Sequence, residues 1–222
     1  IIFEYPLEQA IEDGVLCEFD YIPLDYKLTE NDKQEKKKVY AAKAQAEKDG
    51  RPWSDEQLRI RLAKVNKKAE LKPSILDDYL KSYPDTLKSC IVFVADKEQG
   101  DSVCKVIVNY TQKYKPYYEG THRQYLDMLS TQKIDCLVAC QRLDEGIDIK
   151  SLKNIILVSS DKGKLSTVQR IGRCIRTNPN DKDKKSIVVD FILENTNESP
   201  EKSGTDQDRV EWLKDVSATR KK

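Results

Sequence analysis

The sequence predicts an α/β fold built on a parallel β-sheet. Four short apolar runs rich in β-branched residues occupy residues 90–95, 135–140, 154–159 and 186–192. Each run is continuous rather than alternating, which is typical of strands that are buried on both faces of a parallel sheet. Helical patterns separate the runs, and strands that alternate with helices at this spacing favour right-handed crossovers within one α/β domain.

The front of the chain predicts one further strand and a long helical stretch. Residues 19–27 alternate in polarity and indicate a strand, whereas residues 29–83 are almost entirely helical in pattern. Thr29 and Ser54 are expected N-caps, because each is followed three positions later by a side chain that can complete a capping box. Gly50 opens the break between the two helices that these caps begin.

The second half predicts three helices, one short strand and a polar tail. The helices are expected at residues 97–114, 122–132 and 165–174. A short strand is expected at residues 115–119. The tail is polar from Glu194 through Arg209 and is interpreted as a loop or linker. A short final helix is expected around Trp212.

The charge of the chain is balanced overall and uneven locally. The 222 residues include 39 Lys and Arg against 38 Asp and Glu, for a net charge of +1. This balance excludes a uniformly basic nucleic-acid binder and an acidic tail protein. Residues 27–72 nevertheless hold 14 basic and 8 acidic side chains, a local excess of +6. Solvated helix faces are the favoured interpretation, and an insertion that lies along nucleic-acid phosphates is the alternative.

Other classes of protein are excluded by what the sequence lacks. No apolar run approaches the roughly 20 residues of a membrane-spanning helix, and no basic secretory leader opens the chain. The six cysteines contain no C-x-x-C pair and His122 is the single histidine, so no Cys/His zinc site is expected. We expect reduced thiols in a cytoplasmic protein. Since residue 1 is not Met, a fragment of a longer protein is expected.

Two polar segments of the second half have residue types suited to phosphate chemistry. In residues 140–149, Gly146 permits close approach of a ligand and Asp148 can accept hydrogen bonds from ribose, just beyond a strand end. In the second segment, Gln169, Arg173 and Arg176 share one helix face and form a clamp for phosphate oxygens. Taken singly, the first pattern is usually a turn and the second a solvated face.

In their order, these segments resemble the motifs of superfamily 2 helicases and translocases. QRIGRCIR at residues 169–176 is similar to motif VI, LDEGIDI at 143–149 to motif V, and CIVFVAD at 90–96 to motif IV. The lead-in at residues 4–25 is similar to the interdomain connection of DEAD/DEAH-like proteins of restriction and defence systems. The three motifs in sequence are a specific signal, whereas each alone is a weak one.

The resemblance implies the C-terminal RecA-like domain, of the P-loop NTPase type, of a two-domain ATP-driven motor. Its organisation would be a connection and first strand (1–28), a helical insertion (29–84), the RecA-like domain (85–193), and a polar linker with a terminal helix (194–222). The implied partners are the N-terminal RecA-like domain and nucleic acid, with DNA favoured over RNA. Nuclease or methylase subunits are further implied partners, in a restriction, defence or repair setting.

The resemblance also implies roles for individual residues. The arginine fingers would be Arg176 and Arg173. The nucleotide would be contacted by Gln169, Gly146, Asp148 and Glu145. The nucleic-acid backbone would be faced by Ala95, Asp96, Thr121, Cys140 and Gln141.

The chain lacks the other half of such an ATP site. The chain contains no G-x-x-x-x-G-K-[ST] loop, and no acidic Walker B box follows a strand. ATP would therefore be bound jointly with an N-terminal domain, which would hold Mg²⁺. We therefore expect no ATP hydrolysis by this chain alone. A non-catalytic RecA-like module that binds nucleic acid or protein is the alternative. A dinucleotide-binding enzyme is disfavoured because no G-x-G-x-x-G motif is present.

Overall fold

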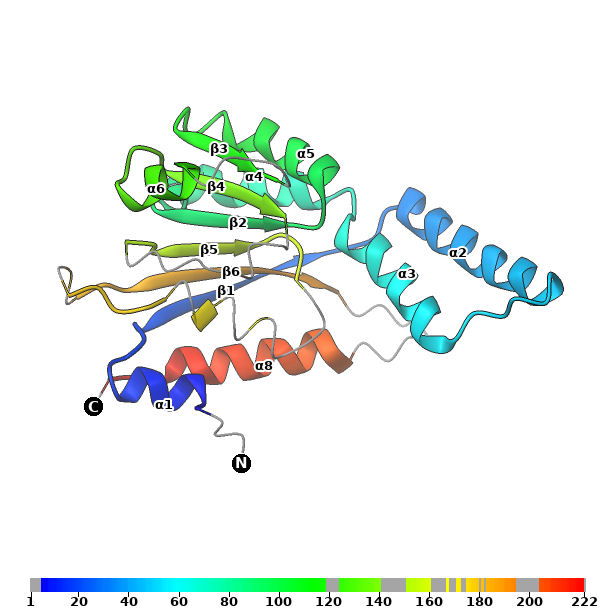
Figure 1. Ribbon diagram of the computed structural model, residues 1–222, viewed down its shortest axis with the longest axis horizontal. Coiled ribbons are helices and arrows are strands. Elements are labelled where there is room, and N and C mark those ends of the chain that lie inside the picture. The colour runs from blue at the N-terminus through cyan, green and yellow to red at the C-terminus, as the bar shows by residue number, and fades with distance from the viewer. Residues whose placement is uncertain are drawn as a thin grey trace.

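The protein is built around one six-stranded, fully parallel sheet. The computed structural model describes residues 5–118, 124–140, 151–160, 167, 171–172, 175–179, 181, 183–194 and 204–221. The strands lie in the order β1-β6-β5-β2-β4-β3 (Figure 1). Their bounds are β1 Phe19–Tyr26, β2 Cys90–Val94, β3 Tyr114–Tyr117, β4 Cys136–Cys140, β5 Asn154–Leu157 and β6 Ser186–Leu193. The predicted α/β fold with a parallel sheet is confirmed.

Helices cover both faces of this sheet. Their bounds are α1 Leu7–Glu12, α2 Glu30–Lys48, α3 Asp55–Lys67, α4 Lys72–Ser82, α5 Lys97–Ile107, α6 Gln124–Ser130 and α8 Gly204–Ala218, with a 3₁₀ turn at Pro84–Leu87. One core contains α1, α6 and α8, and the other contains α4 and α5. Figure 1 shows α1 and α8 side by side on one face and α4 with α5 on the other.

The strands divide their side chains between these two cores. In β2, Ile91 and Phe93 enter the core of α1, α6 and α8, whereas Val92 and Val94 enter the core of α4 and α5. All five β2 residues are buried. A continuous apolar run is therefore required here, because neither face of the strand meets water.

The helices α2 and α3 form a hairpin that projects from the carboxyl edge of the sheet (Figure 1). Both predicted caps are confirmed: Thr29 and Ser54 each accept a backbone N–H from the third helical residue, whose side chain bonds back. Gly50 lies in the connection with a φ of +72°, a left-handed conformation that glycine adopts without strain. Two residues of α2 and α3, Asp32 and Leu62, are buried, so water covers most of the hairpin.

The sequence misplaced two helix ends. The helix predicted at residues 97–114 ends at Ile107, and Tyr114 begins β3 instead. The tail predicted to be a loop through Arg209 is helical from Gly204 onwards, so α8 is longer than the expected short helix. The cause is a tertiary contact: Arg209 is only 6% exposed and packs onto the sheet. No helix of the described chain is long and apolar enough to cross a membrane.

A buried ion pair fixes α8 to β6. The Arg209 Nε donates to Asp190 Oδ2 at 2.8 Å, and the two side chains are 5% and 0% exposed. Tyr21 and Ser160 hydroxyls also donate to the Asp190 carboxylate, at 3.2 and 3.1 Å. Burial raises the pKa of the Asp190 carboxyl, although Arg209 favours its charged form. The pair thus joins β1, β6, α8 and the segment after β5.

Removing one partner of this pair should destabilise the protein strongly. Arg209→Ala leaves a buried carboxylate without its cation, which typically costs about 3–5 kcal/mol. Urea unfolding measures the loss. Arg220→Ala is the control: Arg220 follows the end of α8 and pairs with Glu18 at the surface. An Asp190→Asn, Arg209→Met double variant should recover most of the loss; equal losses for Arg209→Ala and Arg220→Ala would contradict the role of the pair.

Candidate functional site

Three of the predicted nucleic-acid contacts lie together at the carboxyl edge of the sheet. Ala95 and Asp96 directly follow β2, and Cys140 is the last residue of β4. Val94 is the register partner of Cys140, so the three residues occupy adjacent strand ends. The strand order also reverses here, since β4 lies on one side of β2 and β5 on the other. Ligands of open α/β sheets bind at such a reversal.

Asp96 is held by several groups at once. Its carboxylate accepts the Gln99 backbone N–H as the N-cap of α5, and it lies 3.1 Å from the Lys68 ammonium. Burial raises the pKa of the Asp96 carboxyl, but the Gln99 amide and the nearby lysines outweigh it, so the pKa lies below its ordinary value. Asp96 is therefore an anion at neutral pH, and it cannot itself attract a phosphate.

Gln99 connects this segment to the helical hairpin. Its Oε1 accepts the Ala95 backbone N–H at 2.7 Å, and its Nε2 donates to the Lys67 carbonyl at 2.6 Å. Gln99 is only 6% exposed. The Ala95 amide is consequently engaged within the protein, and the C-terminal end of α3 is fixed against the end of β2.

Cys140 is a half-buried thiol beside this anion. Partial burial raises the pKa of the Cys140 thiol, and the negative charges of Asp96 and Asp101 raise it further. The neutral thiol is a weak hydrogen-bond donor. The five described cysteines are all free thiols, as the sequence predicted for them.

Arg176, the predicted arginine finger, lies elsewhere in the domain. The backbone of Leu16 and Arg176 forms an antiparallel bridge, and the Cys17 N–H donates to the Ile175 carbonyl at 2.7 Å. The Arg176 carbonyl accepts from the Lys184 ammonium at 2.6 Å. These residues precede β1 and β6, so they lie at the amino edge, opposite Ala95 and Cys140. The Arg176 side chain is exposed.

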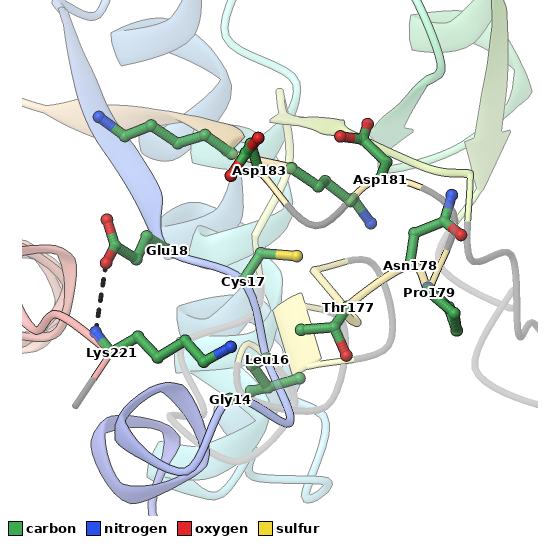
Figure 2. Close-up of a pocket in the computed structure, with 12 residues that line it drawn as sticks. Gly14, Leu16, Cys17, Glu18, Thr177, Asn178, Pro179, Asp181, Asp183 and Lys221 are labelled. Atoms are coloured by element: carbon green, nitrogen blue, oxygen red, sulfur yellow. Dashed lines mark hydrogen bonds between the residues drawn. The ribbon is translucent and has the colours of Figure 1, made fainter.

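A pocket of about 730 Å³ lies at this amino edge, and its lining includes Thr177, the residue that follows Arg176 (Figure 2). It is lined by Gly14, Leu16, Cys17, Glu18, Thr177, Asn178, Pro179, Asp181, Asp183, Lys184, Lys185 and Lys221. Three carboxylates balance three ammonium groups in this lining. The phosphates of a nucleoside triphosphate are negatively charged and require side chains with a net positive charge around them. The described lining therefore does not form a phosphate site by itself.

The remaining predicted contacts fall outside the described residues. They are Arg173, Gln169, Glu145, Gly146, Asp148, Thr121 and Gln141. Their roles stay predictions. In the part of the chain that is described, no group of three His, Cys, Asp or Glu side chains could hold a metal ion.

A buried lysine, Lys72, connects separate segments at the carboxyl edge of the sheet. Lys72 begins α4, is 2% exposed, and donates to the Val158 carbonyl at 2.8 Å and the Lys67 carbonyl at 3.1 Å. Its ammonium also lies 4.4 Å from the centre of the Tyr26 ring, a favourable cation–π geometry. Burial lowers the pKa of Lys72 to about 7, although Asp190 and Asp206 favour its charged form.

Sequence reasoning missed most of these supporting residues. The spacing of Asp96 and Gln99 is that of an N-cap and its third helical residue, so this contact could have been predicted. Lys72 and Arg209 offered no such signal, because each stands in a polar stretch and finds its partners far along the chain.

Comparison with known proteins bears on the resemblance to helicases. Residues 71–178 match the model of the helicase conserved C-terminal domain. The match covers just under half of the chain. The match begins at the start of α4 and includes the ends of β2 and β4 as well as Arg176. The resemblance to helicases expected from the motifs is thereby confirmed.

The known proteins that are similar to this chain differ from it strongly in sequence. The putative helicase 22 of Sulfolobus islandicus filamentous virus (isolate Iceland/Hveragerdi) is 31% identical over 67 residues, which is 30% of this chain and 12% of the viral protein. UvsW of T4 has a TM-score of 0.54 at 13% identity over 89% of this chain. A structure of S. cerevisiae Dbp5 bound to RNA and ADP BeF3 has a TM-score of 0.50 at 13% identity over 97% of this chain.

This chain spans only part of these proteins. It covers 40% of the UvsW chain and 42% of the Dbp5 chain. At such low identity the two structures show a common fold, in agreement with the parallel sheet described above.

The low pKa of Lys72 predicts a pH dependence of stability. The folded pKa of about 7 lies below the ordinary 10.5, so between these values the unfolded chain binds the extra proton. The free energy of unfolding should then rise with pH in this window, by up to about 1.4 kcal/mol per pH unit from this group. Below pH 7 Lys72 is protonated in both the folded and the unfolded chain, so it should add no pH dependence to the free energy of unfolding.

Denaturant unfolding of wild type and Lys72→Met across pH 6.5–10 would measure this, because the difference between the two proteins isolates Lys72 from the cysteines and tyrosines. Lys48→Met, at an exposed position of α2, controls for the loss of one lysine. A wild-type minus Lys72→Met difference that is independent of pH would show that Lys72 is not the responsible group.

Proposed function

We propose that this chain is the C-terminal motor domain of an ATP-dependent nucleic-acid helicase or translocase of superfamily 2. The observation that supports this most directly is the helicase C-terminal family match across residues 71–178, which contains the motif-like segments at 90–96, 143–149 and 169–176. The Dbp5 structure with a similar fold is described as bound to RNA and ADP BeF3. This description supports a nucleic acid and a nucleotide as the ligands of the proposed motor.

In this proposal, the carboxyl edge and Arg176 at the amino edge contact different ligands. The carboxyl edge, with Ala95, Asp96 and Cys140, would lie along the nucleic-acid backbone. Arg176 would reach a nucleotide held by a second RecA-like domain, and an exposed side chain on a firmly held backbone is suited to that role. When bound, ATP with Mg²⁺ would supply the free energy of phosphoryl transfer, and the guanidinium would stabilise the developing charge.

The nucleotide contacts proposed from sequence complete this arrangement. Arg173 would be the second phosphate contact, Gln169 would couple the phosphate to the other domain, and Asp148 would contact the ribose beside Gly146 and Glu145. Thr121 and Gln141 would extend the backbone contacts. We propose DNA as the preferred nucleic acid and a restriction, defence or repair system, with nuclease or methylase partners, as the setting.

The arginine finger can be tested in a longer protein that joins this domain to one with a Walker A loop. Arg176→Ala should lower nucleic-acid-stimulated ATP hydrolysis by about 10³-fold or more, because an arginine finger contributes that much to the rate. Steady-state phosphate release measures the effect. The Arg176 carbonyl, which accepts from Lys184, is retained in the variant, and thermal unfolding checks that the fold is kept.

Arg220→Ala is the matched control, since Arg220 is an arginine at the surface that pairs with Glu18. A rate for Arg176→Ala within a few fold of wild type would rule out the finger. Nucleic-acid binding without any ATP hydrolysis in the joined protein would favour the alternative of a non-catalytic binding module.

A further inference from the structure

The α2–α3 hairpin is joined directly to the candidate nucleic-acid edge. Gln99 bridges the Lys67 carbonyl to the Ala95 N–H, and the Lys68 ammonium contacts the carboxylates of Asp96 and Glu98. The end of α3 is thus part of the same surface as the end of β2. A nucleic-acid strand that lies across Ala95 and Asp96 would therefore also lie near the end of α3.

The fold redistributes the +6 charge of residues 27–72. Lys72 is buried. Lys27, which directly follows β1, pairs with Glu194 at 3.3 Å. On α2, Lys33 and Lys38 pair with Glu30 and Glu35 at 2.9 and 2.6 Å. The exposed positive charge of the hairpin is therefore smaller and more local than the sequence indicated.

Lys64 and Lys97 retain their charge next to Asp96. Lys64 lies in the last turn of α3, four residues before its C-cap Lys68, and Lys97 is the first residue of α5. Both are exposed, and neither has an ion-pair partner within the described chain. Lys64 is close enough for its charge to act on the Asp96 carboxyl.

These charges decide how this edge can meet phosphates. Asp96 is an anion and its neighbour Glu98 is another, so both would repel a nucleic-acid backbone. Lys68 is engaged in neutralising them, which leaves Lys64 on α3 and Lys97 on α5 to attract a phosphate. An ammonium group is a suitable point-charge contact for phosphate.

We propose that Lys64 and Lys97, on α3 and α5, form the phosphate-contacting pair of this edge, and that the α2–α3 hairpin serves to present Lys64 there. The ligand is the phosphodiester backbone of a nucleic-acid strand, bound without base specificity. Gln99 and Lys68 are positioning residues, because they fix the end of α3 against Ala95 and Asp96. This assignment rests on the proposed function and names contacts that the motifs do not supply.

The salt dependence of binding tests this assignment. Each lost phosphate contact should reduce the slope of log K against log salt by about 0.9 on duplex DNA, or about 0.7 on a single strand. We expect this reduction, with weaker binding, for Lys64→Gln and again for Lys97→Gln, and the sum of both for the double variant. Fluorescence anisotropy of the full chain with a labelled oligonucleotide, as single strand and as duplex, gives the slopes.

Two other positions on the hairpin provide matched controls. Arg59→Gln removes an exposed charge from the same helix, about 140° around its axis from Lys64. Lys37→Gln removes an exposed lysine from α2. Both controls should keep the wild-type slope, and thermal unfolding should show all four single variants to be as stable as wild type.

The outcomes separate this assignment from the proposed function. If wild type binds and Lys64→Gln behaves as Arg59→Gln and Lys37→Gln do, the assignment is wrong while the domain function stands. Equal losses in all four variants would indicate diffuse attraction and would also overturn it. If the wild-type chain binds neither oligonucleotide at low salt, the proposed nucleic-acid role itself fails.

Discussion

All six strands run parallel, so every connection must cross a face of the sheet and every strand must bring its carboxyl end to one edge. The first consequence is that helices cover both faces, which removes water from the central strands and demands continuous apolar runs. The second is that residues following different strands meet at one edge. Ala95 and Cys140 are neighbours for this reason, although 45 positions separate them in the sequence.

The parallel sheet also separates Arg176 from the residues that follow β2 and β4. Segments that follow strands lie at the carboxyl edge, whereas the segments before β1 and β6 lie at the amino edge. Arg176 is held at the amino edge by the lead-in strand segment around Leu16 and Cys17.

Buried polar groups give the carboxyl edge a defined geometry. Lys72, Gln99 and the Asp190–Arg209 pair each tie separate elements together through several hydrogen bonds. Desolvation makes such groups costly, so their net contribution to stability is small compared with the apolar cores. They act by permitting a single arrangement of α3, α4 and α8 on the sheet, because any other arrangement would leave a buried charge or amide without its partner.

The sequence by itself determined the strands, the helix caps and the helicase motifs. These features depend on neighbouring residues: apolar runs such as residues 90–94, the Thr29 and Ser54 capping boxes, and the spacing within residues 169–176. Tertiary structure alone decided the rest. Arg209, in a stretch too polar to suggest burial, finds Asp190 on β6, and Lys72 finds the Val158 carbonyl 86 positions away. Lys64 comes near Asp96 only because Gln99 and Lys68 fix the end of α3 against the end of β2. The physical reason is that local patterns set the conformation of a segment, whereas the partner of a charged group depends on which segments the packed cores bring together.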